Sequence, residues 1–144
     1  MENPSETPSS TTSSTRTIVY EGRFPSLNEV IQMAKTHWSV YSKEKERLTT
    51  AVAWEAKAAK LRPCTSPVRV TFTWMEANRR RDVDNISHGC KYVLDGLVEA
   101  SVLEDDSPKY VSEIRHNFMV DKDRPRVIID IEEIAKEEED AGDV

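Results

Sequence analysis

Residues 68–74, VRVTFTW, alternate between apolar and polar side chains, which is the pattern of a β-strand with one buried face. The predicted buried face carries Val68, Val70, Phe72 and Trp74. Segments rich in β-branched and aromatic residues predict further strands at 17–22, at about 110–120 and at 126–133. The turn sequence DKDRP joins the last two. The core of the sheet is expected to be the 68–74 strand and this C-terminal pair.

Helical periodicity recurs in three other segments. PSLNEVIQMAK, residues 25–35, predicts a short helix with Ser26 and Glu29 at the spacing of a capping box. Residues 42–61 predict a longer helix with an apolar face of Leu48, Ala51, Trp54, Ala58 and Leu61. The most regular pattern predicts a helix from 86 to about 100, with Asp84 or Asn85 as its N-cap. Its apolar stripe consists of Ile86, Cys90, Val93, Leu94, Leu97 and Val98.

This mixed order of strands and helices predicts an α+β fold, in which a small mixed β-sheet is packed with helices. One domain fits a chain of 144 residues with 38% hydrophobic content, and it is expected to span residues 17–133. Residues 1–16, MENPSETPSSTTSSTR, contain almost nothing apolar and are expected to be disordered. Residues 134–144 are expected to form a solvated acidic tail.

The formal net charge of −6 is unevenly distributed along the chain. From Asp130 to Val144 there are eight acidic residues and one lysine, whereas residues 1–129 carry 19 basic and 18 acidic side chains. A DNA-binding surface would therefore have to be a local patch. No apolar run approaches the roughly 18 residues that span a membrane, and residues 1–20 lack the features of a signal peptide. We expect a soluble cytoplasmic protein, in which Cys64 and Cys90 are free thiols.

The densest positive charge lies beside a pair of carboxylates in NRRRDVDN, residues 78–85. Asp82 and Asp84 are two positions apart and would point to the same side of an extended backbone. Such a pair suits a hard cation such as Mg²⁺ or Mn²⁺. The alternative is a solvated turn and helix cap, in which the arginines pair with nearby acids.

Further polar residues follow in the predicted helix and after it. Lys91 and Asp95 lie seven and eleven positions after Asp84, on the helix face that Asp84 shares. A lysine in that position could reach a phosphate that the metal also holds. Asp105 and Asp106 add an acidic pair after the helix, although such a pair is commonly only a loop.

Taken together, RRRDVDN…K…LDGLVEASVLEDD…KYV resembles the signature of the RusA family of Holliday junction resolvases, which are common in phages and prophages. FPSLNEVI and PVRVTFTW resemble the phage branch, and the similarity runs from about Phe24 to Ile131. The resemblance implies a RusA-like homodimer that cuts four-way DNA junctions by paired, Mg²⁺-dependent hydrolysis of phosphodiesters. It implies no membrane and no small-molecule cofactor, and it leaves recombination, repair and phage DNA processing open as the biological role.

The resemblance also assigns the site residues. Asp82, Asp84 and Asp106 match the family's metal-binding carboxylates, and Lys91 is similar to its catalytic lysine. The residues that would bind DNA phosphates are Arg79, Arg80, Arg81 and Lys91. The chain departs from the best-known spacing, because His88 stands four positions after Asp84 and the lysine stands seven positions after. Both spacings face Asp84 on a helix, and His88 itself is expected to pack rather than bind metal.

Two other functions and one geometric question stay open. The chain could be a junction-binding protein of phage origin with weak or absent catalysis, or an interaction protein in which DVDN is only a helix cap. A straight helix over 86–100 would be roughly 22 Å long and would carry Asp106 away from Asp82. Either the helix ends early or bends, or a partner subunit supplies the third carboxylate.

Overall fold

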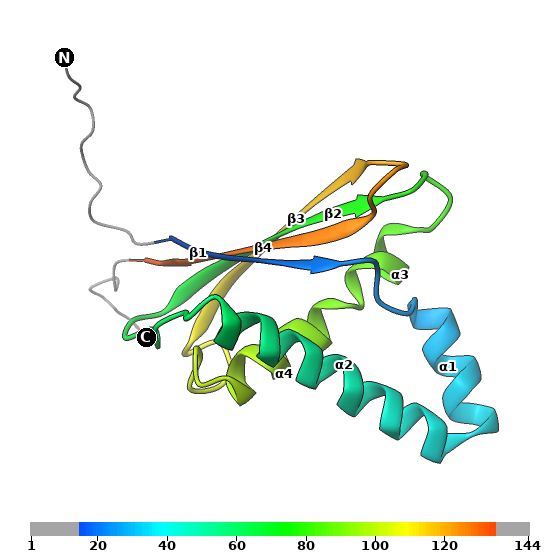
Figure 1. Cartoon of the computed structure of the whole chain (residues 1–144), viewed down its shortest axis with the longest axis horizontal. Coiled ribbons are helices and arrows are strands. Elements are labelled where there is room, and N and C mark those ends of the chain that lie inside the picture. Colours follow the sequence, from blue (N-terminus) through cyan, green and yellow to red (C-terminus); the bar gives the residue numbers. More distant parts are fainter. Residues whose placement is uncertain (1–14, 135–144) are drawn as a thin grey trace, which may run out of the picture.

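A computed structural model describes residues 15–134 as a four-stranded mixed sheet with its helices on one face (Figure 1). The strands are β1 (Thr15–Glu21), β2 (Val68–Glu76), β3 (Val111–Val120) and β4 (Arg126–Glu133), in the spatial order β1-β4-β2-β3. β4 runs antiparallel to β1 and β2, whereas β3 is parallel to β2. The predicted α+β class and mixed sheet are therefore confirmed.

The alternation in 68–74 is confirmed in β2, where every second side chain from Val68 to Glu76 is buried. The strand continues two residues beyond its predicted end, and its last buried position holds a carboxylate. β3 and β4 lie close to their predicted bounds. Only β4 shares the centre of the sheet with β2, whereas β3, which was also expected in the core, is an edge strand.

β1 begins at Thr15, so two residues of the predicted disordered segment belong to the sheet, and the domain starts before residue 17. The side chain of Arg16 explains this boundary, because it is 9% exposed and forms an ion pair with Glu133 at 2.9 Å. Arg16 Nε also donates to the carbonyl of Arg62 at 2.8 Å. Residues 1–14 of the segment, and the predicted acidic tail after Ile134, lie outside the described residues.

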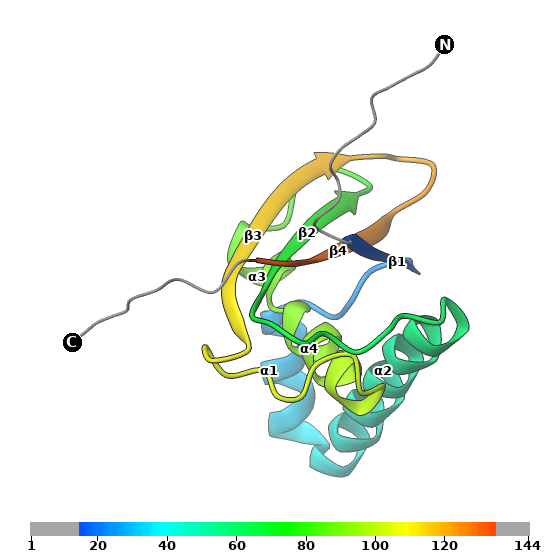
Figure 2. The ribbon, with the colours of Figure 1, turned by 90° about the vertical axis from the view of Figure 1, so that its left-hand side faces the viewer.

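The helices are α1 (Leu27–Thr36), α2 (Trp38–Ala58), α3 (Val83–Ser87) and α4 (Cys90–Glu99), and Figure 2 shows α1, α2 and α4 together beneath the sheet. The predicted capping box is confirmed at α1. Ser26 Oγ accepts from the N–H of Glu29 at 3.1 Å, and Glu29 Oε1 accepts from the N–H of Ser26 at 2.8 Å. This reciprocal pair fixes the start of α1 shortly after β1 ends.

The predicted apolar face of the long helix is wrong in part. α2 buries Tyr41, Leu48, Val52, Ala53 and Ala56. Trp54, which was expected on the buried face, is 64% exposed. The packing of α4 explains this orientation, because a Cβ added to Gly96 would lie only 2.6 Å from Val52 Cβ. A residue without a side chain lets the two helices approach closely on the Val52 side of α2.

The single helix predicted over 86–100 is wrong, because His88 and Gly89 separate α3 from α4. The N-cap of α3 is Asp82 rather than either of the two residues predicted. Gly89 lies against the ring of Phe24, where an added Cβ would be 2.8 Å from Cδ2. The chain therefore turns from α3 into α4 at a point where the Phe24 ring leaves no room for a side chain.

One hydrophobic core lies between the helices and the sheet. Cys64 and Cys90 are free thiols packed against it, as expected, and burial raises the pKa of both. Across residues 15–134 we find no helix with both the length and the apolar character needed to cross a bilayer.

Candidate functional site

The loop between β2 and α3 carries the arginines of NRRRDVDN and is anchored at Glu76. Glu76 is buried at the end of β2. Arg81 forms a two-pronged ion pair with it, through Nε to Oε1 at 3.2 Å and through Nη2 to Oε2 at 3.1 Å. Arg81 Nη1 also donates to the carbonyl of Phe24 at 3.4 Å. This arginine therefore holds the loop against the rest of the fold.

Asp82 and Asp84 lie at the start of α3 with both side chains exposed. Asp84 is already helical, so the strand alternation that was expected to align the two carboxylates does not apply. The carbonyl of Asp82 accepts from the N–H groups of Asn85 and Ile86, but its carboxylate makes no cap. Neither carboxylate has a hydrogen bond or an ion pair to another residue of the described range. Both are therefore available to a ligand.

Asn85, the last residue of the motif, is used by a different helix. Its Oδ1 accepts from the backbone N–H of Asn28 at 3.0 Å, in the first turn of α1. The N–H groups at the start of a helix have no acceptor within the helix itself, so Asn85 satisfies a donor that α1 cannot. The motif is therefore fixed to α1 by Asn85 and to β2 by Arg81.

Lys91 lies in the first turn of α4, where its Nζ is 3.8 Å from Asp95 Oδ2. Its side chain is 45% exposed, so this ion pair leaves the ammonium accessible. His88 packs edge-on against the Tyr92 ring at 5.9 Å, and burial together with the charge of Lys91 lowers the pKa of His88. At the two positions that could carry the family's lysine, the chain thus has a packed imidazole and an accessible cation.

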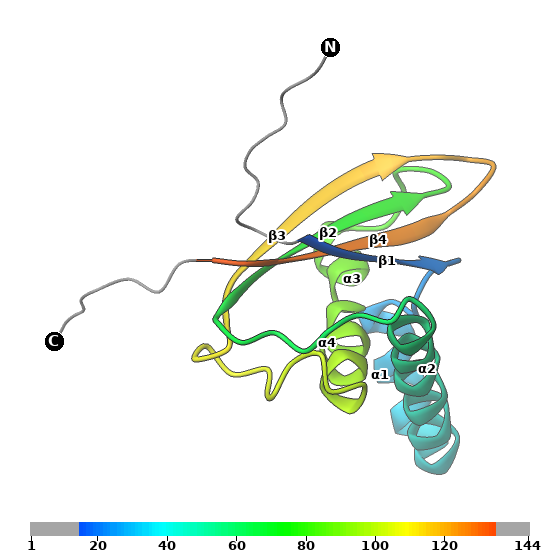
Figure 3. The same cartoon turned by 60° about the vertical axis from the view of Figure 1, so that its left-hand side comes forward.

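Asp105 and Asp106 belong to the loop between α4 and β3, and this loop lies at the opposite end of the sheet from α3 (Figures 1 and 3). The carbonyl of Tyr110, near the end of that loop, accepts from the N–H of Val68 at 2.9 Å. Val68 is the first residue of β2, whereas the loop that precedes Asp82 is anchored at Glu76, the last residue. Eight strand steps separate the two anchors by about 26 Å. The break between α3 and α4 does not shorten this separation.

The described residues contain no group of three His, Cys, Asp or Glu side chains placed to hold a metal ion. Asp82 and Asp84 offer two carboxylates at one end of β2, and Asp106 is at the other end. Within residues 15–134 of one chain, Asp82, Asp84 and Asp106 therefore do not come together in one site.

Comparison with known protein families adds a further observation. The family model of endodeoxyribonuclease RusA matches residues 23–132, which is most of the chain. The chain belongs to the RusA family. No curated protein sequence matches it. Membership confirms the resemblance read from the sequence, and it implies an endonuclease of the Holliday junction resolvase type.

The surface of this RusA-family domain next to Asp82 is basic and apolar. Arg79 and Arg80 are exposed, and neither has an ion-pair partner within residues 15–134. Asn78 Oδ1 accepts from the N–H of Arg80 at 2.9 Å and shapes the turn. A groove of about 220 Å³ lies between this turn, α3 and the end of β3. Its apolar wall includes Val83, which is 58% exposed between the two aspartates.

Two residues gain roles that were missed from the sequence. Glu76 continues the buried alternation of β2, and a charge at such a position needs a partner, so the pattern alone could have pointed to its ion pair. Asn85 gave no such signal, because its partner Asn28 is 57 positions away and belongs to another helix.

Proposed function

We propose that this RusA-family chain is a metal-dependent, structure-selective endodeoxyribonuclease that resolves four-way DNA junctions. The observation that supports it best is the exposed pair Asp82 and Asp84, which has no partner in the described range, next to the exposed Arg79 and Arg80. Carboxylates that stay unpaired beside cations are suited to bind a metal ion together with a phosphate. We expect the protein to act in the cytoplasm of a bacterial or phage-infected cell.

In the proposed site Asp82 and Asp84 hold Mg²⁺, or Mn²⁺, through their carboxylate oxygens. The ion, when bound, supplies Lewis acidity for phosphodiester hydrolysis. Lys91 neutralises charge on the scissile phosphate, because its ammonium is accessible and only weakly held by Asp95 at 3.8 Å.

The arginine loop provides the proposed phosphate-binding surface. Arg79 and Arg80 bind phosphates on either side of the cut, which gives affinity and salt dependence but little sequence preference. Arg81 contributes to this surface mainly by fixing the loop, because its guanidinium is shared between Glu76 and the carbonyl of Phe24.

We further propose that a homodimer completes the carboxylate set. One edge of β3 is unpaired within the described residues, and its exposed apolar residues are Ile114, Phe118, Met119 and Val120. An exposed apolar edge favours pairing with a second strand. In an antiparallel β3–β3 pair about a two-fold axis, the start of one β3 lies beside the end of the other. The Asp106 loop precedes β3, so Asp106 of the partner subunit would approach Asp82 and Asp84.

Cleavage of a synthetic four-way junction tests the function. We expect paired, symmetric nicks with Mg²⁺ and no nicks when EDTA removes it. Asp84→Asn should abolish cleavage and keep junction binding, whereas the matched change Asp105→Asn should leave most of the activity. Equal cleavage by Asp84→Asn would show that the carboxylate pair is not the site.

A junction-binding protein without catalysis is the second candidate. The observation in its favour is that three carboxylates do not meet within the described part of one chain. It predicts a preference for junctions over duplex in a gel shift, but no cleavage with Mg²⁺ or Mn²⁺. The reading of DVDN as only a helix cap has less support, because the Asp82 carboxylate makes no capping hydrogen bond.

A further inference from the structure

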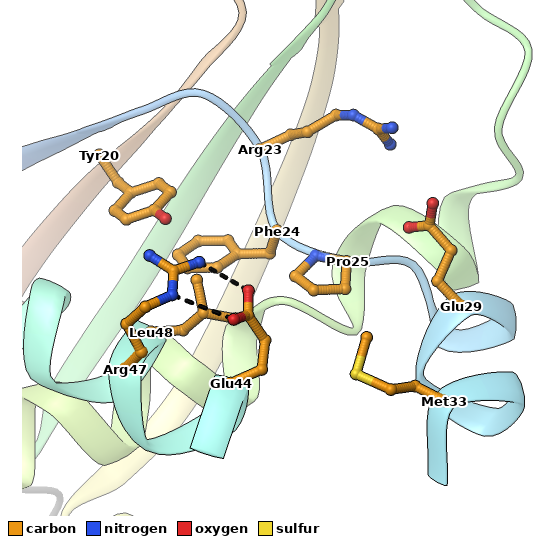
Figure 4. A pocket seen from close by; sticks show the side chains of 9 residues that line it. All are labelled: Tyr20, Arg23, Phe24, Pro25, Glu29, Met33, Glu44, Arg47 and Leu48. Carbon is orange, nitrogen blue, oxygen red and sulfur yellow. Dashed lines mark hydrogen bonds and ion pairs between the residues drawn. The ribbon is translucent and has the colours of Figure 1, made fainter. Parts of the chain in front are cut away.

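A second cavity, of about 360 Å³, lies beside the segment that joins β1 to α1 (Figure 4). This segment separates the cavity from the NRRRDVDN motif. Its floor is apolar and is formed by Phe24, Leu48 and Met33. The ring of Tyr20 stacks on that of Phe24, with 4.2 Å between centroids and 16° between planes. Phe24 is only 2% exposed and also stacks with Tyr92, so the half-buried ring of Tyr20 is the aromatic surface that the cavity presents.

The remaining walls of the cavity are charged. Arg47 forms a two-pronged pair with Glu44, at 3.0 Å for Nε to Oε1 and 2.6 Å for Nη2 to Oε2, so this wall presents donors and acceptors with little net charge. Arg23 lies at the rim, and Figure 4 shows its guanidinium directed away from the floor. Arg23 is exposed and has no ion-pair partner in residues 15–134.

The cavity is adjacent to residues 78–85, NRRRDVDN, which we call the carboxylate motif. The carbonyl of Phe24 accepts from Arg81 Nη1 at 3.4 Å, and Gly89 packs against the Phe24 ring. Four residues later, the N–H of Asn28 donates to Asn85 Oδ1. A single stretch of backbone, residues 24–28, therefore separates the cavity from the motif and is hydrogen-bonded to it at both ends.

We propose that this cavity binds one unpaired nucleobase of the DNA strand whose phosphate lies at Asp82 and Asp84. The inference rests on the proposed nuclease function. A nucleobase has flat apolar faces and hydrogen-bonding edges, which match the Tyr20 ring and the Arg47–Glu44 wall. Arg23 at the rim is placed for the adjoining phosphate. Bases in continuous duplex are stacked and paired, whereas those at a branch point leave the stack at lower cost, so the cavity favours branched DNA.

The test uses the full chain in EDTA and two short single strands of equal length. One strand carries bases, and the other is built of abasic deoxyribose phosphates. We expect the wild-type chain to bind the strand with bases about tenfold more tightly, the effect of one stacked base. Met33→Trp, which fills the cavity, should remove this preference. The matched variant Ile31→Trp, on the same helix but outside the cavity, should keep it.

A second comparison separates base binding from general charge. Arg23→Ala should weaken binding of the base-containing strand more than Lys35→Ala, although each variant removes one positive charge. Equal binding of the two strands by the wild-type chain would overturn the proposal, as would an unchanged preference in Met33→Trp. The cavity would then suit another occupant, such as a protein side chain.

The outcome is independent of cleavage, because no metal is present and no junction is cut. A chain that shows base preference but never cuts junctions would refute the nuclease and retain the base site. A chain that cuts junctions but shows no base preference would retain the nuclease function and refute the base site. With both functions intact, 2-aminopurine placed at the branch point should brighten on binding, and Met33→Trp should abolish that rise.

Discussion

Asn85 Oδ1 accepts the backbone N–H of Asn28 at 3.0 Å, so the asparagine of the carboxylate motif caps α1 and not the helix in which it lies. This contact joins the proposed metal-binding turn to the segment that walls the nucleobase cavity. The first turn of α1 and the turn that carries Asp82 and Asp84 are therefore directly hydrogen-bonded to each other.

Replacing Asn85 by alanine should destabilise the fold by about 1 kcal/mol, the usual cost of a lost helix cap. Denaturant unfolding would measure the loss. Asn117→Ala is the matched control, because Asn117 is exposed on β3 and has no side-chain hydrogen bond within the described residues. If Asn85→Ala were as stable as Asn117→Ala, the Asn85–Asn28 hydrogen bond would contribute nothing to the free energy of unfolding.

Arg81→Met should cost about 2–3 kcal/mol of stability, because it leaves the buried carboxylate of Glu76 without its partner. The double variant Glu76→Met/Arg81→Met should recover most of that loss, since no unpaired charge is then buried. A double variant as unstable as the single one would show that the ion pair is not what holds the loop.

Arg80→Ala should leave stability unchanged and lower the slope of log binding constant against log salt concentration for DNA by about one.

Mixing of two inactive variants tests the shared site. If Asp106 acts in the partner's site, a dimer of one Asp84→Asn chain and one Asp106→Asn chain has one intact site. Random exchange at equal concentrations should then restore about a quarter of the wild-type nicking, almost all as single nicks. If all three carboxylates act within one chain, the mixture should stay as inactive as its components.

The pH dependence of stability should include a contribution from His116. Trp74 Nε1 donates to His116 Nδ1 at 2.9 Å, so that nitrogen must be unprotonated, and burial lowers the pKa of His116. The unfolded chain takes up the proton first, near pH 6.5. The contribution of neutral His116 to the free energy of unfolding is therefore fully present above that pH. It is lost as the pH falls towards the lower folded pKa, by up to about 1.4 kcal/mol per pH unit.

His116→Asn keeps an acceptor for Trp74 and removes the titration, so its unfolding midpoint should fall less than that of the wild type between pH 7.5 and 5.5. The matched control is His37→Asn at an exposed position. Parallel pH profiles for the wild type and His116→Asn would exclude His116 as the cause.

The parts of the fold that were predicted correctly depend on local patterns. The alternation of β2 and the capping box of Ser26 and Glu29 are each complete within a few residues. The buried face of α2 is not, because its many alanines allow several apolar stripes. Val52 is buried and Trp54 is exposed because the Val52 side of α2 packs against Gly96, which lies on another helix.

The candidate site also has one part that the local sequence predicts and one part that depends on contacts between distant elements. Asp82 and Asp84 could be found from their spacing and neighbours, and the structure leaves both unpaired within the described range. The length of the predicted helix raised the question of their distance from Asp106, but the sequence left it open, because the distance depends on β2 and β3 being parallel. A parallel pair puts the loop before β3 at the start of β2, whereas Asp82 follows its end.

The central place of β4 has a consequence for the order of folding during synthesis. Ile129 lies opposite both Ile18 and Phe72, so β4 alone joins the first strand to the rest of the sheet. Among the strands of the described residues it is also the last to leave the ribosome, since chains emerge from the N-terminus onwards. Until residues 126–133 appear, β1 has no partner strand, so the Phe24 segment that follows it is not yet joined to the sheet through β1. A nascent or prematurely released chain would therefore carry the carboxylate motif before the sheet is complete.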